Sequence, residues 1–162
     1  MSNLTQNLQP AALNVPQIAA SAEDKAYAAG WFDARGYFRM SVSEGRTPRM
    51  TIHIQAGRAN PAFFFDRWGG KLGVNQGTLF VVPSKSSRSS NGVKSWQIAR
   101  LPAKNFLLDI APYCLNRGHQ IHLALEFIKY SVECDPKPNR QYLTELAKRI
   151  RVENVSAMAW TD

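Results

Sequence analysis

The sequence predicts an α+β fold in which helices alternate with pairs of antiparallel strands. A helix-like run of small and apolar residues near the N-terminus passes directly into two stretches that alternate apolar and polar residues. A short helical segment and a second pair of strand-like runs follow, and three helical stretches complete the chain. The expected element order is therefore αββαββααα, with a four-stranded antiparallel sheet.

The first predicted helix begins after Ser21 and ends at Gly36. Ser21 can cap it, and Glu23 and Asp24 stand in the first turn, where the helix dipole favours acidic side chains. One face of this helix combines aromatic and small residues, namely Tyr27, Gly30, Trp31 and Ala34. Small side chains there would let another backbone approach closely.

The first predicted strand pair has one apolar and one polar face. On the apolar face are Phe38, Met40 and Val42 of one strand and Met50, Ile52 and Ile54 of the other. The polar face has Tyr37, Arg39, Ser41, Ser43, Arg49, Thr51, His53 and Gln55. This alternation is typical of antiparallel strands with one side toward water.

The remaining elements are predicted from turn signals and periodicity. Pro61 is a good first helical residue, and a helix is expected to about Trp68. The runs "GTLFVVP" and "VKSWQIARL" form the second strand pair, joined by a serine-rich basic loop. Helices are expected at about 103–110, 119–130 and 139–155.

Composition favours a polyanionic partner. The 162 residues suit one domain, and 20 Lys and Arg against 12 Asp and Glu give a formal net charge of +8. Nucleic acid is the first expectation, and a basic surface kept only for solubility is the alternative. The two cysteines, Cys114 and Cys134, form no disulfide framework, and no apolar run is long enough to span a membrane. These observations favour an intracellular protein of the cytoplasm or nucleoid, or of an organelle stroma or matrix.

Residues 1–22 contain no charged side chain and are rich in Asn, Gln, Ala and Pro. They have neither the basic start and apolar core of a signal peptide nor the arginines of a transit peptide. We therefore expect a flexible leader at 1–22 and a single domain at 23–162.

The segment "AAGWFDARG" resembles the LAGLIDADG motif of the homing endonucleases. Ala29, Gly30, Asp33, Ala34 and Gly36 match the motif identically, and Trp31 and Phe32 are apolar substitutes. The two strand pairs, "GGKLGV" and "LPAKNFLLDIAPYCLNRGHQIHLALEFI" follow in the order of the single-motif, homodimeric members. The resemblance covers roughly 24–155 and implies an αββαββα fold with additional C-terminal helices.

The resemblance implies a homodimer on a long, roughly palindromic duplex DNA site. The motif helices of two subunits would pack together through Tyr27, Ala28, Ala29, Gly30, Trp31, Asp33 and Ala34. An ordinary helix crossing inside one chain is the alternative for this face. The sheet would curve as a saddle over the major groove.

The saddle supplies the expected DNA contacts. Base edges would be read by the polar side chains of the first strand pair given above, together with Thr78, Phe80, Ser95 and Gln97. The basic loop at Lys85 and Arg88, together with Arg58, Lys94 and Lys104, suits phosphates, which position the protein without specifying sequence. A solvated sheet face is the alternative for any one of these residues.

The catalytic position departs from the family pattern. In the family, the acid before the last motif glycine holds divalent cations, and here that position is Arg35. Arg58 and Arg117 correspond to supporting positions, and with Arg35 they would form a phosphate clamp. Asp33 lies about 200° round the helix from Arg35, and in the family pattern that earlier acid is structural.

We therefore expect a sequence-specific DNA-binding homodimer that is impaired in metal-dependent cleavage. No metal site or cofactor is predicted, and Mg²⁺ would be needed only by an active enzyme. Two alternatives stay open: an active, intron-associated homing endonuclease that recruits metal through other acids such as Asp33, and an RNA-binding splicing accessory using the same basic saddle.

Overall fold

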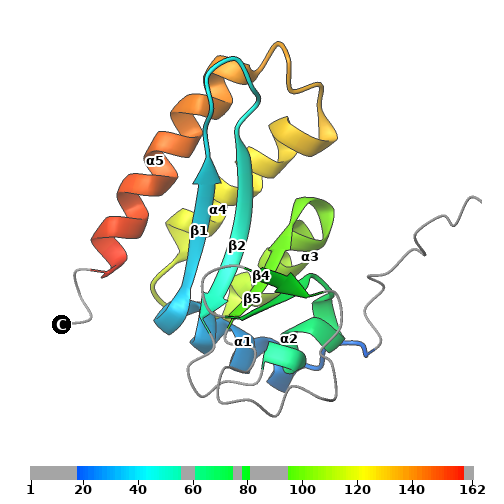
Figure 1. Cartoon of the computed structure of the whole chain (residues 1–162). Helices are drawn as coiled ribbons and strands as arrows, with labels where there is room; N and C mark the ends of the chain where they lie inside the picture. The colour runs from blue at the N-terminus through cyan, green and yellow to red at the C-terminus, as the bar shows by residue number, and fades with distance from the viewer. Residues whose placement is uncertain (1–17, 56–60, 75–77, 81–94, 159–162) are drawn as a thin grey trace, which may run out of the picture.

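The computed structural model describes residues 18–55, 61–74, 78–80 and 95–158. Its elements are α1 (Ala22–Arg35), β1 (Gly36–Ser41), β2 (Arg49–Gln55), α2 (Pro61–Trp68), β3 (Lys71–Val74), β4 (Thr78–Phe80), β5 (Ser95–Ala99), α3 (Arg100–Ile110), η1 (Ala111–Tyr113), α4 (Gly118–Ile128), η2 (Lys129–Glu133) and α5 (Arg140–Met158) (Figure 1). The predicted α+β class is confirmed. The helices predicted at 22–35 and 61–68 have those bounds.

The sheet differs from the prediction by one strand. Within the described residues it has five antiparallel strands in the order β1-β2-β5-β3-β4. The expected pairing of the runs at 77–83 and 93–101 with each other is wrong, because β4 and β5 each pair with β3. β3 has four residues, one of them a glycine, and is too short to show a period of two.

Gly70 explains how β3 reaches this place. Its φ of 93° is unfavourable for other residues, and a Cβ atom there would lie 2.3 Å from the carbonyl oxygen of Gln97. The indole nitrogen of Trp96 donates to the carbonyl of the preceding Gly69 at 2.7 Å. The chain therefore turns directly from α2 into a strand beside β5.

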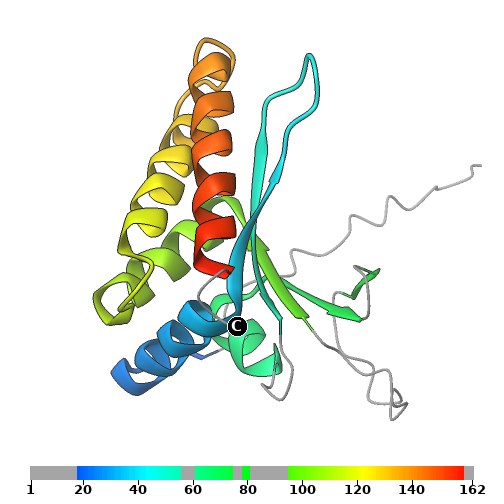
Figure 2. The same ribbon diagram turned by 90° about the vertical axis from the view of Figure 1, so that its left-hand side faces the viewer.

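Helices α3, α4 and α5 lie on one side of the sheet (Figure 2). Phe38, Met40, Ile52 and Ile54 are buried on that side. The core continues into an aromatic cluster in which Trp96 packs on Phe64 and Phe106, with ring centroids 5.2 and 4.9 Å apart.

The C-terminal helix α5 covers the edge strand β1. The amide of Asn154 donates to the carbonyl of Phe38 at 2.7 Å and accepts from its N–H at 3.4 Å. Arg151 donates to the carbonyl of Met40 at 2.9 Å. Side chains of α5 thus satisfy backbone groups that an edge strand leaves unpaired.

The motif helix α1 has the predicted start and end. Ser21 and Asp24 form a reciprocal capping box. At the other end, a Cβ atom on Gly36 would lie 2.2 Å from the Phe32 ring and 2.7 Å from the Phe32 carbonyl oxygen. Only glycine allows the chain to pass at this point from helix into strand without displacing Phe32.

Replacing Gly36 with alanine should therefore destabilise the fold. The added methyl group overlaps a backbone atom that cannot move easily, and we expect a loss of about 2 kcal/mol in the free energy of unfolding. Gly118→Ala is the matched control, because nothing lies within 4 Å of a Cβ atom there. Urea denaturation of both variants measures the difference, and equal midpoints would contradict this account of Gly36.

Candidate nucleic-acid interface

The face of the sheet opposite the helices has the expected polar side chains. Arg39, Ser41 and Arg49 are exposed, and they alternate with residues of the core. The register places Arg39 opposite Thr51, and Ser41 opposite Arg49. The predicted polar face of the first strand pair is therefore present at these positions.

A row of polar residues crosses four strands on this face. Tyr37 of β1 pairs with His53 of β2, His53 pairs with Gln97 of β5, and Gln97 pairs with Lys71 of β3. Lys71 is exposed. Sequence reasoning missed it because β3 was not predicted as a strand.

His53 differs from the expectation of a water-exposed side chain. It is 4 % exposed, and its ring stacks on Tyr37 with centroids 5.0 Å apart and planes 20° apart. Burial, with a smaller contribution from the charge of Arg39, lowers the pKa of His53 to about 4. The imidazole is therefore neutral near pH 7, and its Nε2 atom has no hydrogen-bond partner in the described part of the chain.

Other predicted DNA contacts fall into three groups. Ser95 and Gln97 are half-buried on β5, and Ser43 is exposed just beyond β1. Thr78 and Phe80 pair with Val74 and Leu72, and Leu72 is buried in the core. The predicted DNA contact of Thr78 and Phe80 stays a prediction, since the structure describes only the backbone pairing of β4. Gln55 pairs with Ser95, and Arg58, Lys85, Arg88 and Lys94 lie outside the described residues.

The position that corresponds to the metal-binding acid of the motif ends α1. Arg35 is the last residue of that helix, and its side chain is exposed. Asp33 is engaged elsewhere: its Oδ2 atom accepts a hydrogen bond of 2.7 Å from the N–H of Leu115. The other oxygen, Oδ1, is buried without a hydrogen-bond partner among the described residues. Asp33 thus joins the end of α1 to the turn after η1.

Arg117 does not take part in a phosphate clamp. It is 6 % exposed, donates from Nε to the carbonyl of Asp33 at 3.3 Å, and donates from Nη1 to Gln120 at 3.0 Å. Its guanidinium lies 5.5 Å from the centre of the Phe32 ring, and burial lowers its pKa. The expected cluster with Arg35 is therefore corrected: Arg117 stabilises the chain internally.

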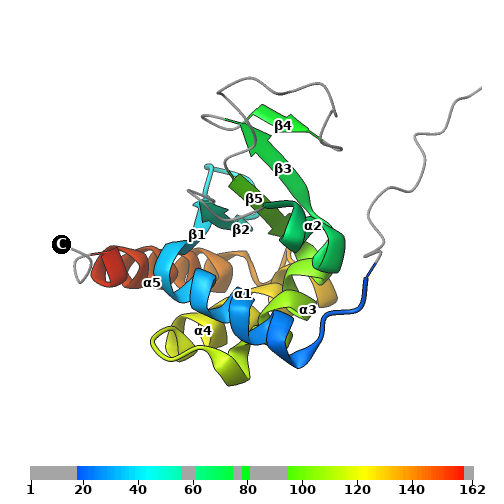
Figure 3. The ribbon, with the colours of Figure 1, turned by 90° about the horizontal axis from the view of Figure 1, so that it is seen from below.

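The predicted dimer face is narrower than expected. Ala28 and Ala29 are fully buried in the chain's own core, so their predicted contact with a second copy is corrected. Tyr27, Gly30 and Ala34 are exposed, and Trp31 is partly buried. Seen from below, α1 lies on the side nearest the viewer (Figure 3), which leaves this narrower face at the surface.

In the part of the chain that the structure describes, no three His, Cys, Asp or Glu side chains lie close enough together to hold a metal ion. Nor does any helix there have the length and apolar character needed to cross a bilayer.

Comparison with known proteins supports the fold. The chain is similar to two structures of the homing endonuclease I-CvuI, one with its target (Sro1.3) in the presence of Ca and one with the I-CreI target (C1221) in the presence of Mg, in which the DNA is not cleaved. For the first structure the TM-score is 0.59 at 16 % identity, with 81 % of this chain and 82 % of the other covered. For the second it is 0.58 at 16 % identity, with 82 % and 84 % covered. No family model and no curated protein matches the sequence. The chain therefore has the homing endonuclease fold.

The lowered pKa of His53 predicts a loss of stability in acid. His53 has a folded-state pKa of about 4 and an ordinary value of 6.5, so only the unfolded chain takes up a proton between these pH values. The free energy of unfolding is therefore unaffected by His53 above pH 6.5 and falls by about 3 kcal/mol in all as the pH drops toward 4. His53→Phe keeps a ring against Tyr37 and removes the titration. Urea unfolding at pH 7 and pH 5 should show a smaller acid loss in this variant than in the wild type.

His122→Asn serves as the control, because His122 is exposed on α4. It should leave the pH dependence unchanged. An acid loss of the same size in wild type and His53→Phe would show that the buried imidazole is not its source.

Proposed function

We propose that this protein is a LAGLIDADG-type homodimer that binds duplex DNA sequence-specifically and does not cleave it. The observation that carries the proposal is the polar face of the sheet, on which Arg39, Arg49 and Lys71 are exposed, in a chain with the homing endonuclease fold. Such a surface suits a DNA groove, since arginine can bind guanine through two hydrogen bonds and Gln97 can do the same with adenine. Arg39, Arg49 and Lys71 supply positive charge on this face.

The loss of cleavage follows from the residue at the end of α1. A guanidinium in place of a carboxylate removes a metal ligand and adds a repelling charge. Two unit positive charges about 4 Å apart repel by roughly 4 kcal/mol at an effective dielectric constant of 20, and a divalent ion doubles this. A homodimer would bring two such arginines to the cleavage site.

The active-endonuclease alternative requires Asp33 to hold the metal. The hydrogen bond from the N–H of Leu115 argues against this, because the Asp33 carboxylate would have to give it up to reach a cation. The RNA-binding alternative uses the same cationic surface. A competition between duplex DNA and structured RNA separates it from the main proposal.

The first experiment selects DNA sites bound by the purified protein and incubates the selected duplex with Mg²⁺ or with EDTA. We expect binding in both conditions and no cut product, since Arg35 replaces the metal-binding acid. Binding should also weaken steeply with salt, with a log–log slope near −7 if about eight phosphates are neutralised. Cleavage that depends on Mg²⁺ and disappears with EDTA would overturn the inactive assignment.

Specific contacts are tested with a matched pair of arginines. Arg39→Ala, on the sheet face, should cost about 1–3 kcal/mol of binding and relax the base preference at one position. Arg149→Ala removes the same charge from an exposed position on α5, on the other side of the sheet, and should leave the preference unchanged.

The homodimer is proposed from the packing around Gly30. A glycine in a helix interior costs about 1 kcal/mol relative to alanine, and nothing in the described chain lies within 4 Å of a Cβ atom there. The structure of one chain therefore offers no reason for this glycine. Close approach of the α1 helix of a second copy would explain Gly30, because only glycine leaves room for another backbone at this point.

Gly30→Leu should give a folded monomer. The leucine projects from an exposed position, so we expect thermal stability of the single chain to be kept while the contact between copies is lost. Analytical ultracentrifugation at micromolar concentration compares it with Ala26→Leu, an exposed position nearer the start of α1. A wild-type protein that sediments as a monomer would contradict the proposal.

A further inference from the structure

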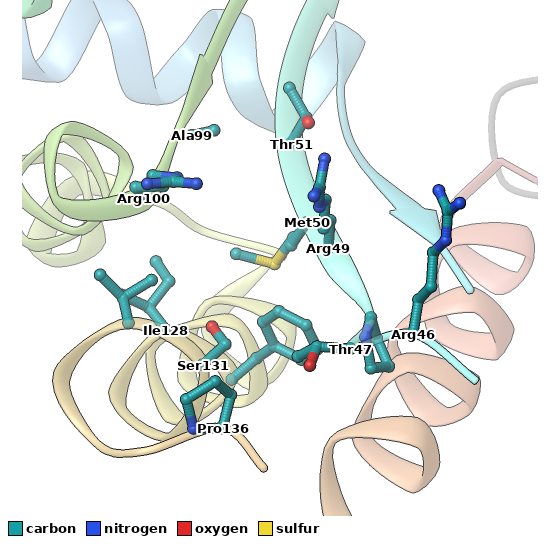
Figure 4. Close-up of a pocket in the computed structure, with 13 residues that line it drawn as sticks. Arg46, Thr47, Arg49, Met50, Thr51, Ala99, Arg100, Ile128, Ser131 and Pro136 are labelled. Atoms are coloured by element: carbon teal, nitrogen blue, oxygen red, sulfur yellow. The ribbon is translucent and has the colours of Figure 1, made fainter. Parts of the chain in front are cut away.

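A cleft of about 720 Å³ opens beside the outer end of β2, beyond the point where β5 ends (Figure 4). Its rim has three arginines, Arg46, Arg49 and Arg100, and its floor includes Met50 and Ile128. No acidic residue lines it. Of the predicted DNA contacts, Arg49 and Thr51 line this cleft.

The three guanidiniums of the cleft are free to bind a ligand. All three side chains are exposed, and the ion pairs of the described residues involve none of them. Three positive charges around one cleft, with no carboxylate lining it, favour the binding of an anion. Guanidinium groups match the geometry of phosphate oxygens through paired hydrogen bonds.

Arg100 is held at the cleft by a strained backbone. Its φ is 59°, and it is the only residue other than glycine with positive φ in the described part of the chain. The left-handed conformation costs roughly 1–2 kcal/mol for such a residue, and glycine would avoid this cost. An arginine at this point is therefore better explained by what its side chain binds than by the turn from β5 into α3.

The cleft continues onto the proposed DNA-binding face. A second cavity of about 380 Å³ is lined by Lys71 and Gln97 and shares Thr51, Ala99 and Arg100 with the first. A cationic groove thus runs from the polar row of the sheet, past Arg100, to Arg49 and Arg46. Its course suits the backbone of a strand whose bases lie on the sheet.

We propose that this cleft binds a phosphate group of the nucleic-acid backbone, at the outer end of the sheet. The identity of the polymer rests on the function proposed above, whereas phosphate recognition rests on the cleft itself. The chemistry is that of a phosphodiester, and a free nucleotide could present the same group. Arg46 and Arg100 are the ligands that distinguish this cleft from the base-reading strands.

The first test compares two double variants in duplex binding. Arg46→Gln with Arg100→Gln should weaken binding of the selected duplex about tenfold or more at 0.1 M salt, and reduce the magnitude of the salt slope by about 1, without altering base preference. Lys148→Gln with Arg149→Gln removes the same charge from exposed positions on α5 and should change affinity less than about threefold. Equal effects of the two double variants would overturn the proposal.

The second test needs no duplex. Inorganic phosphate and the dinucleotide d(TpT) are titrated into the full chain while the Nε–H signals of the arginines are followed by NMR. Arg46 and Arg100 should shift saturably, and Arg149 should not. If the wild type binds no duplex, the function proposed above fails, and this titration decides about the cleft alone: a saturable shift supports a phosphate site for free nucleotides, and no shift overturns it.

Arg100→Gly excludes misfolding as the cause of lost binding. It removes the strained conformation, so its thermal midpoint should be equal to or above that of the wild type, while its phosphate-induced shift at Arg46 weakens. A variant that keeps the wild-type response to phosphate would show that Arg100 is not a ligand.

Discussion

The burial of Trp96 is the interaction on which the arrangement of the sheet depends. Its side chain is fully buried on β5, between β2 and β3, and packs on rings from α2 and α3. An aromatic side chain of this size buries roughly 150–250 Å², which at about 25 cal/mol per Å² stabilises the fold by around 5 kcal/mol. The indole also donates a hydrogen bond to the carbonyl of Gly69. This bond fixes the point at which the chain leaves α2 and enters β3.

With Trp96 directed into the core, its neighbours on β5 must lie on the other side of the sheet. Ser95 and Gln97 are placed there by the alternation of the strand, and Gln97 lies in line with His53 and Lys71. The packing of the core and the composition of the polar face are thus two results of one register. A slip by one residue would bury Gln97 and expose Trp96, which makes such a slip costly.

Much of this arrangement could be predicted from the sequence, because the strongest signals are local. The capping box at Ser21, the glycine that ends α1 and the alternation in β1 and β2 need only neighbouring residues. The features that were missed depend on contacts between distant segments. β3 takes its place from Gly70 and Trp96, and the burial of His53 and Arg117 depends on contacts with Tyr37 and with the carbonyl of Asp33, which are distant in the sequence. The interior packing of Ala28 and Ala29 likewise required the whole core to be known.

The contact between Asn154 and Phe38 has a consequence for assembly. A side-chain amide that both donates and accepts occupies the backbone groups which a further strand would use, and Arg151 occupies the carbonyl of Met40. Growth of the sheet by strand addition at β1 is therefore blocked at these residues, in a chain whose long β1–β2 hairpin would otherwise invite it. Fraying of the last turns of α5 would uncover this edge. The C-terminal helix thus shields an edge strand from pairing with another chain as well as completing the core.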